Sequence, residues 1–454
     1  MRERFIALAL ACPVLAFGCS GLPAPHGAGV PEAGGDPILQ RAVSLARPLA
    51  NPADVPSPAL GALARAIGDA RIVMLGEPWH GDGGAIRLRG EIVRFLHDSL
   101  GFDVLAFESD FFSTTHGWET EAAVRGAAGV AADNIYPFWA TTRAAAPLWE
   151  YIERQRVGSR PLDVVGLDPK HVGATARRSL PPELERRLVE LTDVPAEQRR
   201  AFHSVLENYL KREQVYRPTP DELAVFFTTL EALERAMRAR PAAQREPFWE
   251  QAVRNLIGAG EYAWRGASRD RVMGENLLWL ATQRYPDRRI IVWAHNNHII
   301  TDKWMYYGAP DTVIQRALLG RPHARIARAT YLGAEAREYF GPKVYSLGLL
   351  SHAGTFTPDI RTNVDVSTGE FEEGEFGVVK PLSPTPAGTL EAALAQAGHR
   401  TAFLDLAPFR GPEGALAARV LDYSVTPPRR MRYWEGFDGF LFIRETVGLN
   451  EPWP

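Results

Sequence analysis

Residues Arg71–Gly101 read RIVMLGEPWHGDGGAIRLRGEIVRFLHDSLG and contain the pattern that decides the fold. The apolar run Ile72–Leu75 is typical of a strand that is buried on both faces. A turn-rich segment, Gly76–Gly84, follows it, and apolar residues then recur at helical spacing as far as Leu100. Gly101 stands where the C-terminal stop of a helix is expected. The stretch therefore predicts a strand, a loop and a helix.

The rest of the chain repeats this pattern. A second strand is expected at Phe102–Phe107, and a strand, a helix and a strand in succession form a βαβ unit with parallel strands and a right-handed crossover. Further strands are expected at Leu162–Leu167, Arg289–Ala294, Ile326–Leu332, Val344–Leu349, Thr401–Leu404 and Gly439–Ile443. Helices are expected at Pro37–Arg47, Leu60–Ile67, Ala145–Arg156, Ser268–Arg284, Thr312–Leu319, Leu390–Ala397 and Glu413–Val420. The expected fold is α/β, a mostly parallel sheet flanked by helices.

Residues 181–260 differ in character from the rest, because they are charged, helical in period and interrupted by prolines. We expect a helical insertion here within an α/β domain that spans residues 59–454. Such an insertion can act as a lid over a site, or it can be structural padding. The sequence does not decide between these two roles.

Composition limits the class of protein. The chain has 454 residues, 46% hydrophobic and 23% charged, which is ordinary for a globular protein. A net charge of −3 argues against a nucleic-acid-binding surface. The only cysteines are Cys12 and Cys19, so neither a disulfide in the mature chain nor a cysteine-based zinc site is expected.

The N-terminus has the features of a secretory signal peptide. Arg2 and Arg4 precede the apolar run Phe5–Phe17, which is too short to span a bilayer. The small residue before Cys19 resembles a bacterial lipobox, in which this cysteine becomes the lipidated first residue. We therefore expect a signal and lipobox at residues 1–19, a tether at 20–58, and a lipid-anchored or periplasmic protein of the cell envelope. Plain secretion and a cytoplasmic location are the alternatives, and the oligomeric state is not predicted.

Titratable side chains follow several of the expected strands. They are Glu77, His80 and Asp82 after the first strand, Glu108 after the second, Asp168 after the third, and His295 and His298 after Arg289–Ala294. In an open α/β sheet the loops at the carboxyl ends of the strands build the site. These residues are therefore expected to share one crevice, with Arg89 two turns into the following helix.

These residue types suit proton transfer. Histidine is the side chain best placed to move protons at neutral pH, and a carboxylate beside it can fix its tautomer. Glu77 or Glu108 could fill that role for His80. Arg89 could bind a carboxylate or an oxyanion, or it could be a solvated helix residue. No Gly-x-Ser-x-Gly elbow and no catalytic cysteine are present, so a hydrolase would use water, activated by histidine or by a metal.

The order and spacing of several segments resemble the erythromycin esterase family. The segments are Ile72–His80 (IVMLGEPWH), Arg89, Gly101–Glu108 (GFDVLAFE), Asp270–Leu280 (DRVMGENLLWL), Val292–His298 (VWAHNNH), Tyr345–Phe356 (YSLGLLSHAGTF) and Phe437–Thr446 (FDGFLFIRET). The resemblance implies a metal-independent esterase, without a cofactor, of the kind that opens a macrolide lactone ring. It also implies that His80 is the general base and that Glu77, Arg89, His295 and His298 belong to the same site.

Three functional hypotheses follow. In the first, an ester or lactone hydrolase, His80 activates water, Glu77 or Glu108 orients His80, and His295, His298 and Arg89 stabilise the oxyanion. In the second, Glu77, His80, His295 and His298 bind a metal that assists hydrolysis. In the third, the protein binds haem or another hydrophobic ligand in the envelope without turnover. In all cases Trp79, which stands where the family has small or polar residues, is expected to narrow the site.

Overall fold

The computed structural model describes residues 35–49, 58–212, 215–302, 331–357, 379–410, 416, 419–422, 429–430 and 434–453. The signal and lipobox, most of the tether, the helix expected at 312–319 and most of the helix expected at 413–420 lie outside these residues and stay predictions. Of the strand expected at 326–332, only the end is described, and there Leu332 begins a helix instead. Within the described ranges, no helix combines the length and the apolar character that crossing a bilayer requires.

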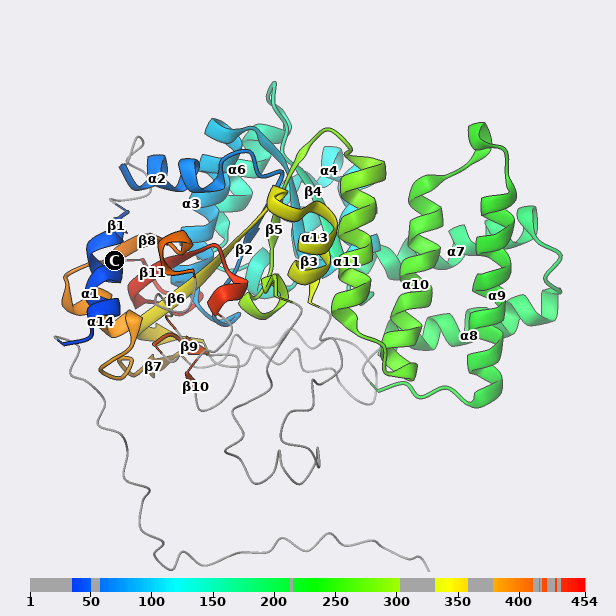
Figure 1. Ribbon diagram of the computed structural model, residues 1–454. Helices are drawn as coiled ribbons and strands as arrows, with labels where there is room; N and C mark the ends of the chain where they lie inside the picture. Colours follow the sequence, from blue (N-terminus) through cyan, green and yellow to red (C-terminus); the bar gives the residue numbers. More distant parts are fainter. Residues whose placement is uncertain are drawn as a thin grey trace, which may run out of the picture.

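A nine-stranded sheet forms the centre of the described structure, in the order β1-β8-β11-β6-β2-β5-β3-β4 with β7 beside β6 (Figure 1). The strands are β1 Arg47–Pro48, β2 Ile72–Leu75, β3 Phe102–Asp110, β4 Asp163–Asp168, β5 Arg289–Trp293, β6 Val344–Phe356, β7 Lys380–Leu382, β8 Thr401–Asp405 and β11 Gly439–Thr446; β9 Leu421–Asp422 and β10 Arg429–Arg430 form a separate pair. From β11 to β4 all neighbours are parallel, while β1, β7 and β8 pair antiparallel. The predicted α/β fold with a mostly parallel sheet is confirmed.

Helices of the described residues cover both faces of this sheet, and others lie beyond its edge. They are α1 Pro37–Leu45, α2 Pro58–Ile67, α3 Gly83–Leu100, α4 Phe111–Asn134, α5 Pro137–Ala140, α6 Ala146–Arg156, α7 Ala174–Leu191, α8 Ala196–Arg212, α9 Pro220–Ala239, α10 Pro247–Arg265, α11 Arg269–Trp279, α13 Leu332–Phe340 and α14 Leu390–Gln396, with a π-turn η2 at Leu280–Arg284 and short 3-10 turns η1 Ala242–Gln244, η3 Asn296–Ile299, η4 Gly341–Lys343, η5 Ala407–Phe409 and η6 Trp434–Gly436. Successive side chains of a strand point to opposite faces. Val73 and Leu75 accordingly join a core with α2, α3, α4 and α6, whereas Ile72 and Met74 join a core with α1, α11, α13 and α14.

Helices α7–α10 form the region predicted as a helical insertion, with slightly wider bounds than expected. They build an apolar core of their own, which includes Leu184, Phe202, Leu230 and Leu256. Figure 1 shows them, in green, beyond the β4 edge of the sheet. A lid role for these helices stays a prediction.

The loop between β2 and α3 is held at its end by Asp82. The side chain of Asp82 caps α3 by accepting a hydrogen bond of 2.7 Å from the amide of Ala85. It also accepts hydrogen bonds from the hydroxyls of Ser351 and Thr446. Asp82 is therefore a structural residue that fixes where α3 begins, at Gly83, three residues after His80.

Candidate active site

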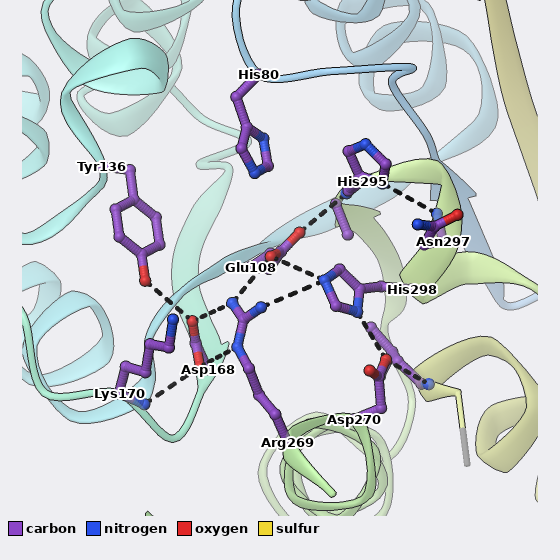
Figure 2. A network of polar contacts seen from close by, with 12 residues as sticks. His80, Glu108, Tyr136, Asp168, Lys170, Arg269, Asp270, His295, Asn297 and His298 are labelled. Atoms are coloured by element: carbon purple, nitrogen blue, oxygen red, sulfur yellow. Dashed lines mark hydrogen bonds and ion pairs between the residues drawn. The ribbon is translucent and has the colours of Figure 1, made fainter. Parts of the chain in front are cut away.

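The carboxyl ends of β2, β5, β3 and β4 lie side by side, and they bring the predicted residues into one place. The ring centres of His80 and His295 are 5.5 Å apart, and those of His295 and His298 are 6.4 Å apart. Figure 2 shows these three histidines around Glu108, with Asp168 on the neighbouring strand. Residues separated by more than 200 positions in the chain thus face a common space, as the sequence predicted.

His80 is oriented by Glu77. The Nδ1 atom of His80 lies 2.7 Å from Oε1 of Glu77, which is fully buried. Because a carboxylate accepts hydrogen bonds, this contact places the proton on Nδ1 and leaves Nε2 as a lone-pair acceptor. No hydrogen bond to Nε2 is formed by any residue that the structure describes. The alternative left open by the sequence, Glu77 or Glu108 as the orienting carboxylate, is resolved in favour of Glu77.

Aromatic rings surround His80. Phe138 stacks on its imidazole at 4.6 Å, and Trp139 contacts it edge-on at 5.3 Å while donating its indole N–H to Glu77. Desolvation by these neighbours lowers the pKa of His80 to about 4, although the charge of Glu108 acts in the opposite direction. The side chain still keeps 41% of its surface exposed. His80 is thus a neutral base at pH 7 that substrate can reach.

Arg89 lies behind Glu77, away from the open part of the site. Its side chain is fully buried, pairs with Oε2 of Glu77, and stacks on Trp293 at 3.8 Å. A second donor, Nη1, reaches the carbonyl of Ala294 at 3.3 Å. The predicted role of Arg89 as an oxyanion donor is wrong, because every face of the guanidinium is covered by protein. It is a positioning residue that compensates the charge of Glu77.

Glu108 stands in an irregular part of β3. The regular pairing of β3 with β5 ends at Phe107, and its register with β4 shifts before Asp110. Such bulges redirect a side chain, and the carboxylate of Glu108 faces the histidines. It accepts from the backbone amide of His295 at 2.9 Å and contacts Nε2 of His298 at 3.1 Å. Glu108 therefore organises the β5 loop and does not orient His80.

His298 carries a positive charge in this site. Its Nδ1 lies 2.7 Å from Asp270, and its Nε2 contacts Glu108. Burial opposes the charge, but these two carboxylates together raise the pKa of His298 to about 10. Both N–H groups are engaged by carboxylates. The predicted role of His298 as an oxyanion donor does not fit this arrangement.

His295 is neutral and held by the main chain. Its Nε2–H donates to the carbonyl of Pro78 at 2.8 Å, and its Nδ1 accepts from the amide of Asn297 at 3.2 Å. Burial lowers the pKa of His295 to about 3, and the neighbouring histidines act in the same direction. With both ring nitrogens used, His295 joins the β2 and β5 loops. It offers no free donor to an oxyanion, in contrast to the sequence prediction.

Arg269 is the residue that sequence reasoning missed most clearly. It begins α11 and donates to both Glu108, at 2.9 Å, and Asp168, whose carboxylate it meets through two donors. The hydroxyl of Tyr136 also donates to Asp168, at 3.2 Å. The only sequence signal was the position of Arg269 after Ser268, which caps α11. Its partners lie on β3 and β4, more than 100 residues away.

The donor atoms needed for a metal are largely occupied. Glu77 is bound by His80, Arg89 and Trp139, and both nitrogens of His295 are bound by the main chain. Among the described residues, no group of three or more His, Cys, Asp or Glu has the arrangement of a metal site. The donor set fits a proton-transfer site better than a metal centre.

Trp79 forms part of the wall beside His80. It is half-buried and packs against Phe356, at the end of β6, with the ring centres 5.6 Å apart. That this indole narrows the site for a bulky substrate stays a prediction. The site can therefore activate a water molecule at Nε2 of His80 beside a wall of aromatic rings.

Comparison with known proteins places the chain among erythromycin esterases and related proteins. The family model for erythromycin esterase matches residues 97–446. The putative hydrolase YbfO of Bacillus subtilis (strain 168) is 23% identical over 407 residues, which cover 83% of this chain and 81% of that protein.

Two solved structures share the fold. A succinoglycan biosynthesis protein has a TM-score of 0.63 and 16% identity, and the match covers 91% of this chain and 98% of that one. A mutant of erythromycin esterase EreC in its open conformation has a TM-score of 0.58 and 15% identity, with coverage of 89% and 98%. At these identities the similarity extends to the fold alone.

Proposed function

Because the chain belongs to the erythromycin esterase family, we propose that it is a hydrolase that cleaves carboxylic esters or lactones with water activated by His80. The observation that carries the proposal is the Glu77–His80 pair. It leaves an unprotonated Nε2 on a solvent-accessible imidazole, with Arg89 compensating the carboxylate behind it. No serine or cysteine nucleophile is needed in this scheme.

The proposed reaction has two steps. His80 Nε2 removes a proton from water as the water oxygen attacks the carbonyl carbon, and the carbonyl oxygen becomes an oxyanion. The tetrahedral intermediate then collapses, the carbon–oxygen bond of the ester breaks, and the imidazolium returns the proton to the leaving alkoxide. The products are a carboxylic acid and an alcohol, or one hydroxy acid from a lactone. Glu77 stabilises the transient imidazolium, as the acid of a catalytic triad does.

A substrate screen tests this proposal. Purified protein is incubated with aryl esters, simple lactones and macrolides, and acid release is followed together with product mass. We expect turnover of small esters or lactones in preference to macrolides, because Trp79 occupies part of the wall. Absence of turnover across the whole panel would contradict the proposal and favour the alternative of a ligand-binding protein.

The pH profile of hydrolysis should have a wide plateau. His80 acts as a base only when neutral, so kcat/KM falls as pH drops through its pKa. Burial lowers that pKa to about 4, so the acid limb should lie on the acid side of the ordinary histidine value of 6.5. His298 stays charged up to about pH 10, so the alkaline limb should begin there. A profile of kcat/KM from pH 4 to 10.5 measures both limbs, and an acid limb above pH 7 would contradict the assignment.

Removal of metals should leave hydrolysis unchanged. The oxygens of Glu77 and the nitrogens of His295 are already bound within the protein, so the proposed water activation needs no metal. Elemental analysis and an assay after dialysis against EDTA measure this. Loss of turnover that one added divalent metal restores would instead support metal-assisted hydrolysis.

A further inference from the structure

Most N–H groups on the histidines and arginines of the site already bind acceptors within the protein, so few donors are left for an oxyanion. His298 is bound to two carboxylates, and His295 is bound to main-chain atoms. Arg269 is held on Glu108 and Asp168, and its remaining Nη1 faces His298 at 3.3 Å. Hydrolysis of an ester develops a full negative charge on the carbonyl oxygen, and this charge requires a donor in the site.

Lys170 is a cation at the edge of the site, and its charge helps to lower the pKa of the buried Asp168. It follows β4 by two residues and is half-buried. Within the part of the chain that the structure describes, its ammonium group makes no hydrogen bond and no ion pair. Figure 2 shows the side chain extending toward the hydroxyl of Tyr136 and the carboxylate of Asp168, on the opposite side of the site from the His80 backbone.

The loop that carries Lys170 is fixed at both sides. The backbone amide of Lys170 donates to Asp168 at 3.2 Å. The next residue, His171, is buried between Tyr209 of α8 and Asn255 of α10, with contacts of 3.5 and 3.4 Å. The main chain is therefore anchored, whereas the lysine stem can adjust. A fixed backbone with a flexible lysine side chain suits an ammonium group whose hydrogen-bond acceptor, an oxyanion, forms only during the reaction.

We propose that Lys170 is a catalytic residue whose ammonium group donates a hydrogen bond to the oxyanion of the tetrahedral intermediate. The inference rests on the proposed function and adds an oxyanion donor to hydrolysis by His80. Lys170 takes part in no covalent step and keeps its three protons throughout. The positive charge also reaches His80, because Lys170 is one of the cations that lower the pKa of His80.

The first test is Lys170→Met, assayed with neutral aryl esters. Loss of one oxyanion donor is worth about 10²–10³ in kcat, so kcat should fall by that factor while KM stays close to that of wild type. Lys170→Arg should retain part of kcat, because it keeps the charge. Lys211→Met is the matched control, since Lys211 is an exposed lysine on α8. An unchanged kcat in Lys170→Met would overturn the inference.

The acid limb of the pH profile gives a readout that a purely structural lysine would not change. The charged or titratable groups near His80 are Glu77, Glu108, Lys170, Arg269, His295 and His298. Removing the Lys170 charge favours the imidazolium, so the acid limb of kcat/KM should move to higher pH in Lys170→Met. An acid limb that stays in place would contradict the placement of the ammonium group near His80.

A binding experiment and a comparison of substrates distinguish an oxyanion donor from other roles of Lys170. An alkyl phosphonate, which imitates the charged tetrahedral intermediate, should bind Lys170→Met more weakly than wild type in calorimetry; equal binding would overturn the inference. If the substitution raises only KM, and only for esters that carry a carboxylate, Lys170 would be a contact for substrate charge instead. The proposed function is judged separately, by loss of turnover in His80→Ala.

Discussion

Replacing His80 with alanine is expected to reduce hydrolysis by about 10²–10⁴-fold, the range supplied by one positioned general base. The substitution removes the Nε2 acceptor on which water activation depends. It should leave the fold intact, because Glu77 keeps its contacts with Arg89 and Trp139. Steady-state kinetics on the best ester of the screen, together with a thermal melt, measures both effects.

His203→Ala is the matched control for this experiment. His203 lies on α8 and pairs with Glu185 at 2.9 Å, outside the site. Glu185 keeps a second partner, Arg199, so the control should lose neither activity nor much stability. Turnover in His80→Ala at the wild-type rate would contradict the proposal that His80 activates the water molecule. A large drop in its melting temperature would show that His80 supports the fold instead.

The half of the site that surrounds His80 was predictable because it is local. Glu77, His80 and Arg89 lie on one strand–loop–helix unit, so spacing alone places them together. The role of Arg89 was not predictable, because it depends on the carbonyl of Ala294 and the ring of Trp293 on β5. Whether an arginine faces solvent or a buried carboxylate is decided by the strand that packs against it.

The other half of the site depends on the strand order. In the chain β3 follows β2, which made Glu108 a plausible partner for His80. In the sheet β5 lies between these two strands, so Glu108 meets the loop of His295 and His298. The hydrophobic pattern of the sequence does not show that β5, which is distant in the chain, lies between β2 and β3. Asp270 and Arg269 were missed for the same reason, since their partners come from other elements.

The extension of β3 beyond its predicted end has a similar cause. The apolar run stops at Phe107, but pairing with β4 continues through a register shift to Asp110 and Asp168. Three carboxylates are thereby buried at neighbouring strand ends, Glu108, Asp110 and Asp168. A pattern based on hydrophobic residues ends the strand too early, because charged residues are buried here with partners supplied by the tertiary structure.

Arg269→Met is expected to destabilise the protein by about 3–5 kcal/mol, the cost of removing one partner of a buried ion pair. Glu108 is 2% exposed and Asp168 is fully buried, and Arg269 is the cation that both carboxylates share. Methionine fills similar space but donates no hydrogen bond, so Asp168 loses its ion-pair partner and Glu108 keeps only His298. Equilibrium unfolding in urea at pH 7 measures the change in free energy.

The pH dependence separates lost charge compensation from lost packing. Burial alone would raise the pKa values of Glu108 and Asp168, but Arg269 and the other cations lower them in the wild type. A carboxyl group with a lowered pKa contributes stability above its unfolded pKa, about 4, and the contribution is lost as pH falls through the folded value. The difference between Arg269→Met and wild type should therefore be largest near pH 7 and disappear only below about pH 4, where the carboxyl groups of the wild type also become protonated. A difference independent of pH would indicate lost packing alone.

Arg271→Met provides the matched control for Arg269→Met. Arg271 lies two residues further along α11, is 37% exposed, and pairs with Glu261 and Glu275 at the surface. Exposed pairs of this kind contribute about 0–1 kcal/mol. Equal losses for the two variants would contradict the role assigned to Arg269, because that role depends on the burial of its two carboxylate partners. A large loss of unfolding free energy in Arg269→Met alone would support the assigned role. In that role, the contact of α11 with the ends of β3 and β4 keeps Glu108 in place beside the histidines.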